Sequence, residues 1–125
     1  MTEVINFIGR NGAGKSTSAQ YLAKELNGVG YRVQVLSFAT PLKQIVRKYF
    51  NTSKEEGRRD ILEQFGQDMK RFCGNDLWAN VLADKIDYDN DFVIVDDMRY
   101  PVEYDVLAVC YPVHTILVAR KSDLI

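Results

Sequence analysis

Residues 3–26 read EVINFIGRNGAGKSTSAQYLAKEL, and this stretch decides the fold. Residues 3–8 form a short apolar run rich in β-branched side chains, which is typical of a buried parallel strand. The glycine-rich residues 9–14 follow directly. Over residues 16–26 apolar side chains recur at helical spacing, and Gly28 lies just beyond as a stop signal. A strand, a glycine loop and a helix therefore follow one another.

The rest of the chain continues this alternation of strand patterns and helix patterns. Strands that alternate with helices predict an α/β three-layer sandwich, with a mainly parallel sheet of four strands and helices on both faces. We expect a single domain over residues 1–125, with a helical insertion over about residues 40–90. After the first strand and helix, strands are expected at 32–38, 92–95 and 114–119, and helices from Pro41, from Ser53 with Glu56 as a capping box, from Asp76 to Ile86, and from Pro101.

Composition restricts the partners and the compartment. The 16 basic and 17 acidic side chains give a net charge of about -1, so no global electrostatic attraction to nucleic acid or to a membrane surface is expected. The N-terminus has no signal-peptide pattern, and no apolar run reaches the ~20 residues of a membrane span. Cys73 and Cys110 lack metal-ligand spacing and are expected to be reduced, buried thiols. These features favour a cytoplasmic protein.

The glycine loop satisfies the Walker A pattern, in which a glycine and four free positions precede glycine, lysine and a hydroxyl residue. Such a loop turns backbone N–H groups toward an anion, and the next helix directs its positive dipole end to the same place. A glycine-rich turn that binds nothing would leave the lysine and the hydroxyl unexplained. The pattern therefore predicts ATP bound with Mg²⁺, with Lys15 on the β- and γ-phosphates and Ser16 on the metal. The predicted ATP-binding residues are Asn11, Gly12, Ala13, Gly14, Lys15, Ser16 and Thr17.

A triphosphate site also needs a carboxylate at the end of a neighbouring buried strand, where it holds Mg²⁺ directly or through water. Asp96 and Asp97 end the apolar run of residues 92–95 and are the candidates. Consecutive strand residues point to opposite faces, so the sequence does not choose between the two.

The fifty or so residues between the second and third strands are rich in lysine and arginine, Lys43 included, and could bind an acceptor that carries its own phosphate. Arg59 and Arg71 stand out because they lie among apolar helical positions. Four strings from this region onward, together with the Walker A loop, resemble the deoxynucleoside monophosphate kinases of tailed phages in content and order. These strings are SFATPLK (37–43), RDILEQFGQDMKR (59–71), GNDLWANVL (74–82) and VIVDDMRYPVE (93–103).

The resemblance implies ATP-dependent phosphorylation of a deoxynucleoside monophosphate to the diphosphate, in the host cytoplasm if a phage encodes the chain. On matching positions, Asp97 takes the place of the family's strand-end acid. The resemblance also implies that Phe38 and Trp78 wall the nucleotide pocket. Arg59, Arg71 and Arg99 would hold the acceptor phosphate or the transferring group, with Arg71 and Arg99 joining Lys15 in catalysis.

Two departures from the family pattern keep alternatives open. Where the family usually has glutamine, three residues before Gly66, this chain has Glu63, with Gln64 displaced by one place. The family's mobile lid and its last strand and helix are also missing after the strand at 114–119. The alternatives are a nucleotide-binding module without turnover and a kinase for another small metabolite. The oligomeric state stays open, with a homodimer among the options.

Overall fold

The computed structural model describes residues 1–10, 12–50 and 59–121, and within them it contains one parallel four-stranded sheet. The strand order is β2-β3-β1-β4, so the first strand is central and pairs in parallel with both β3 and β4. The predicted α/β fold with a parallel sheet of four strands is confirmed. The strands are β1 (Glu3–Ile8), β2 (Val33–Leu36), β3 (Phe92–Val95) and β4 (Val113–Leu117).

Helices connect these strands close to the expected positions. Helix α2 begins two residues before Pro41, which lies in its first turn as expected, and α4 ends at Asp84 rather than at Ile86. Asp76 occupies the N-cap of α4, but its side chain makes no capping hydrogen bond. The predicted capping box of Ser53 and Glu56 lies outside the described residues. The helices are α1 (Lys15–Gly28), α2 (Ala39–Phe50), α3 (Arg59–Cys73), α4 (Leu77–Asp84) and α5 (Pro101–Cys110).

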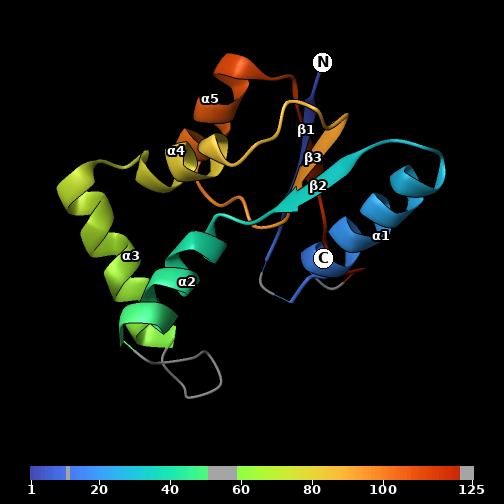
Figure 1. Ribbon diagram of the computed structural model, residues 1–125. Helices are drawn as coiled ribbons and strands as arrows, with labels where there is room; N and C mark the ends of the chain where they lie inside the picture. Colours follow the sequence, from blue (N-terminus) through green and yellow to red (C-terminus); the bar gives the residue numbers. More distant parts are fainter. Residues whose placement is uncertain (11, 51–58, 122–125) are drawn as a thin grey trace.

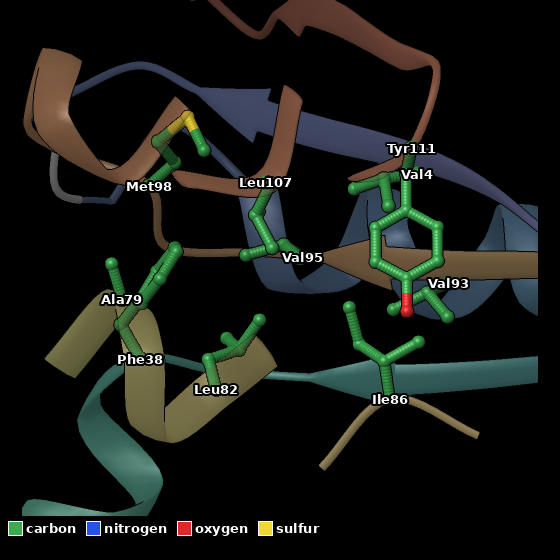
Figure 2. Close-up of a cluster of buried hydrophobic side chains, with 10 residues drawn as sticks. All are labelled: Val4, Phe38, Ala79, Leu82, Ile86, Val93, Val95, Met98, Leu107 and Tyr111. Atoms are coloured by element: carbon green, nitrogen blue, oxygen red, sulfur yellow. The ribbon is translucent and has the colours of Figure 1, made fainter. Parts of the chain in front are cut away.

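Helices cover both faces of the sheet, as the three-layer prediction requires (Figure 1). On one face α1 packs Ala19 and Ala23 against Phe7 and Ile94 of the two central strands. On the other face α4 and α5 pack against a second cluster (Figure 2). The alternation of side chains along each strand supplies both faces from the same short segments. The second cluster contains Val4, Phe38, Ala79, Leu82, Ile86, Val93, Val95, Met98, Leu107 and Tyr111.

Helices α2 and α3 extend away from the sheet beyond the carboxyl end of β2 (Figure 1). They contact each other and α4, and they form a helical arm at the edge where all four parallel strands end. In the described residues, no helix combines the length and the apolar character that a membrane span requires.

The expectation of buried thiols is wrong, because Cys73 and Cys110 are both exposed. Each is the last residue of its helix, α3 or α5.

Candidate functional site

One cleft lies at the carboxyl edge of the sheet, between the glycine loop and the helical arm. Its volume is about 790 Å³. Parallel sheets bind ligands in this position because the loops after neighbouring strands converge there. The lining residues come from the glycine loop and the start of α1, from the segments after β2 and β3, and from α2, α3, α4, α5 and the segment between α3 and α4: Gly12, Gly14, Lys15, Ser16, Thr17, Ser37, Phe38, Ala39, Leu42, Lys43, Leu62, Glu63, Gly66, Gln67, Lys70, Asn75, Trp78, Ala79, Asp96, Asp97, Arg99, Tyr100 and Glu103.

The start of α1 has the features of an anion site. Gly14 occupies its N-cap in the left-handed region, with φ of 98°, which a residue with a side chain adopts only under strain. No side chain caps the helix, and its first turn contains no acidic residue. The first N–H groups of any α-helix have no partner within the helix, so this terminus offers donors and a positive dipole end to the cleft. Lys15 lies at the same point, and its Nζ donates to the Gly9 carbonyl at 2.7 Å.

Asp96 completes a cluster of oxygen donors next to this helix start. The Ser16 hydroxyl donates to Oδ2 of Asp96 at 3.4 Å, and the Ser37 hydroxyl donates to Oδ1 of the same carboxylate. Hard oxygen ligands suit Mg²⁺, which is commonly held by one or two carboxylates together with substrate phosphates rather than by a cage of protein ligands. Ser16 and Asp96 therefore fit the predicted metal.

Asp97 points elsewhere and holds the start of α2. Its Oδ1 accepts the Phe38 N–H at 2.7 Å, and its Oδ2 accepts the Ala39 N–H at 3.0 Å. Burial raises the pKa of Asp97 above its ordinary value of 3.8, and these two hydrogen bonds oppose the rise. The predicted metal pair is thus divided: Asp96 faces Ser16, whereas both oxygens of Asp97 are engaged by backbone.

Glu103 plays the corresponding part at the start of α5. Its Oε1 accepts the backbone N–H groups of Arg99 and Tyr100, each at 2.8 Å. The side chain is buried, and burial raises the pKa of Glu103 above its ordinary value of 4.5. Four helices begin at the cleft: carboxylates accept backbone N–H groups at the starts of α2 and α5, whereas α1 and α4 have no side-chain cap.

The raised pKa of Glu103 predicts the direction of a pH effect on stability. A carboxyl whose pKa is higher in the folded protein than in the unfolded chain favours folding at low pH, and this contribution is lost as the pH rises through the folded pKa. Glu103→Gln keeps an Oε1 acceptor for both N–H groups and removes the buried charge. We expect the unfolding free energy of Glu103→Gln, relative to that of the wild type, to increase between pH 4.5 and pH 7. The increase should be about 1.4 kcal/mol for each pH unit by which folding raises the pKa of Glu103.

Urea unfolding of both proteins at several pH values measures this difference, in which the contributions of groups that do not interact with Glu103 cancel. A Glu103→Gln curve that stays parallel to that of the wild type would show that the raised pKa does not influence folding.

The end of the cleft next to the helical arm is lined by two cations, Lys43 and Lys70, and by an apolar slot formed by Trp78 and Leu42. Nζ of Lys70 lies 3.8 Å from the centre of the Tyr100 ring, a cation–π contact that holds the ammonium beside the cleft. The indole N–H of Trp78 donates to the Gly66 carbonyl at 3.2 Å, which fixes the indole against α3. A Cβ on Gly66 would lie 3.0 Å from Cδ2 of Leu42, so glycine lets α2 and α3 approach closely.

The structure gathers most of the predicted site residues along this cleft, but it places Arg71 outside it. The Arg71 side chain is 74% exposed, and its guanidinium lies 3.8 Å from a carboxylate oxygen of Asp68. Lys70, one position earlier, faces the cleft instead, because the adjacent positions differ by about 100° around a helix. Ala13 does not line the cleft among the described residues, and its N–H donates to the Arg10 carbonyl at 3.1 Å.

Three further predictions have different outcomes. Phe38 borders the cleft, but only 5% of it is exposed, and it lies near Ala79 in the core cluster (Figure 2), so core packing accounts for most of its surface. Asn11 and the side chain of Arg59 lie outside the described part of the structure. Glu63 lines the cleft at the position where the family has glutamine, whereas Gln64 donates to Asp68 at 2.9 Å.

Several lining residues were not predicted from the sequence. Ser37 directly follows β2, and polar residues at the carboxyl ends of strands beside a Walker A loop are a signal that could have found it. The others depend on how α3 and α5 are rotated about their axes and on where the segment between α3 and α4 lies, which spacing alone does not give. They include Gln67, Lys70, Asn75, Tyr100 and Glu103.

Comparison with known proteins adds little to this site. No protein-family model matches the chain, and neither does any curated protein. Among solved structures, the crystal structure of APE1195 is similar, with 21% sequence identity and a TM-score of 0.47. The match covers 98% of this chain and 63% of APE1195, so the chain spans less than two thirds of that protein.

Proposed function

We propose that this protein transfers the γ-phosphoryl group of ATP to a deoxynucleoside monophosphate. The observation that carries the proposal is the continuity of the cleft. The uncapped, lysine-bearing start of α1 lies at one end, and the cations and apolar slot of the helical arm lie at the other. Phosphoryl transfer between two nucleotides needs this arrangement, because donor and acceptor must be held in line within one site.

At the α1 end, the residues match the needs of a triphosphate. Lys15 would leave the Gly9 carbonyl for the β- and γ-phosphates, and the first N–H groups of α1 would bind phosphate oxygens. Ser16 and Asp96 would hold Mg²⁺, which when bound neutralises charge on the β- and γ-phosphate oxygens. Asp97 and Glu103 would take no part in the chemistry. Their engaged oxygens keep α2 and α5 in place around the site.

Lys43 and Lys70 of the helical arm, together with Arg99 from the segment between β3 and α5, would supply positive charge for the acceptor phosphate. The slot formed by Trp78 and Leu42 would receive the base, with the indole as its flat wall. An oxygen of the acceptor phosphate attacks the γ-phosphorus. The bond from that phosphorus to the β–γ bridging oxygen breaks, and the products are a nucleoside diphosphate and ADP. The acceptor attacks as an anion, so no general base is needed.

Incubation with ATP, MgCl₂ and each of the four deoxynucleoside monophosphates tests the proposal, with ADP and the deoxynucleoside diphosphate separated by ion-exchange chromatography. Equal formation of the two products from at least one acceptor would support it. ATP binding without transfer to any nucleotide would contradict it and favour a binding module. Transfer only to a different phosphorylated or hydroxylated metabolite would also contradict it.

Two neighbouring cations provide a sharper test of the acceptor end. Lys70→Ala is expected to raise the KM for the acceptor by about tenfold, because a charge-assisted hydrogen bond to its phosphate is lost, and to change kcat much less. Arg71→Ala removes the same charge from the next position on α3 and should stay within about twofold of the wild type, as exposed ion pairs contribute little. A larger KM effect for Arg71→Ala than for Lys70→Ala would refute this placement of the acceptor.

A further inference from the structure

Arg120 lies against the glycine loop from a distant part of the sequence. Its Nε donates to the Gly12 carbonyl at 2.9 Å, and its Nη2 donates to the same oxygen. The two residues are 108 positions apart. They meet because β4 pairs with β1, and the chain continues alongside it, where the Val118 N–H donates to the Ile8 carbonyl at 2.8 Å. The segment after β4 therefore passes directly over the loop that follows β1.

The backbone of Gly12 requires glycine, and the absence of a side chain also leaves room for Arg120. The backbone of Gly12 is in the left-handed region, with φ of 77°. A Cβ on this residue would lie 2.6 Å from Nη2 of Arg120, so the guanidinium occupies the space that a side chain would need. The glycine thus serves the approach of the arginine as well as the turn itself.

The contact fixes one peptide unit from both sides. The peptide that joins Gly12 to Ala13 has its carbonyl oxygen held by Arg120 and its N–H held by the Arg10 carbonyl at 3.1 Å. A peptide is planar, so two opposed hydrogen bonds set the orientation of the whole unit. The next residues are Gly14 and Lys15, where the N–H groups of α1 face the cleft, so this peptide determines how the chain enters the helix.

We propose that Arg120 is a positioning residue that holds the loop in its anion-binding conformation. The inference rests on the proposed function in one respect, namely that the anion is the triphosphate of ATP. Arginine suits this role because its guanidinium presents two charged donors in a rigid plane to one carbonyl oxygen, whereas lysine presents a point charge. Because the loop is already in this conformation, ATP binding costs less conformational entropy.

Amide hydrogen exchange of the nucleotide-free protein tests the positioning directly. The variants are Arg120→Ala, Arg120→Lys and the matched control Lys121→Ala, which removes one positive charge from the adjacent exposed residue. We expect exchange in the proteolytic fragment that spans the loop to accelerate about fivefold in both Arg120 variants, as for the loss of one net hydrogen bond. Lys121→Ala should match the wild type.

Calorimetry with ATP and MgCl₂ supplies the second measurement, in which both Arg120 variants should bind about fivefold more weakly than the wild type and Lys121→Ala. Unchanged loop exchange in Arg120→Ala would overturn the inference. So would faster exchange with unchanged ATP affinity, or wild-type affinity in Arg120→Lys, which would show that charge alone matters. The exchange result does not depend on catalysis, so absence of phosphoryl transfer would refute the proposed function and leave this inference standing.

Discussion

Lys15→Ala is expected to lower kcat/KM for ATP by about 10³-fold while leaving the fold intact, because charge that develops on the transferring phosphoryl group would no longer be stabilised by the Lys15 ammonium. The stability should change little, because the loss of the Lys15 hydrogen bond to the Gly9 carbonyl opposes the gain from removing an unfavourably placed charge. Lys15 is the first residue of α1, where a positive side chain opposes the positive end of the helix dipole. A cation in that position weakens the helix, and the proposed function explains its presence, because it would bind the phosphates.

Lys24→Ala is the matched control for this prediction. It removes the same side chain from an exposed position on the same helix and should leave both turnover and ATP affinity near wild type. Steady-state kinetics, ATP calorimetry and thermal unfolding of the three proteins together decide the outcome. If Lys15→Ala retained wild-type turnover, the start of α1 would not be the triphosphate site.

The sequence predicts the parts of this site that are formed by contiguous residues. A β-branched run, a glycine loop and a helical repeat are contiguous, so β1, the loop and α1 follow from spacing alone. The strand-end carboxylates were also found from the sequence, but not the choice between them. That choice depends on β3 lying directly beside β1, which places Asp96 within reach of Ser16, and strand order is not encoded in local periodicity.

Residues that reach the site through tertiary packing escaped prediction for a related reason. Lys70 and Arg71 are adjacent cations on one amphipathic helix, and only the rotation of α3 in the arm determines which of them faces the cleft. Arg120 contacts a loop more than a hundred positions away, and no local pattern marks it. A basic residue just past the end of a strand next to a Walker A loop is the weak signal that could have indicated it.

The two strand-end aspartates should separate catalysis from stability. Asp96→Asn is expected to reduce kcat by about 10²-fold and to raise the Mg²⁺ concentration required, because the carboxylate that accepts the Ser16 hydroxyl becomes a neutral amide. Its effect on folding should be small, because the amide oxygen can still accept the Ser37 hydroxyl. Kinetics across a series of MgCl₂ concentrations measure the first effect, and urea unfolding measures the second.

Asp97→Asn should give the reverse pattern, because both oxygens of Asp97 accept backbone N–H groups. An asparagine has one acceptor oxygen, so its amide nitrogen would face either the Phe38 or the Ala39 N–H and leave that donor without a partner. We expect a loss of about 1–3 kcal/mol of unfolding free energy, with the Mg²⁺ requirement of the folded fraction unchanged. The opposite result, in which Asp97→Asn shifts the Mg²⁺ requirement and Asp96→Asn lowers stability, would assign the metal to Asp97. The exchange of roles would then mean that the carboxylate engaged with α2 leaves it when ATP binds.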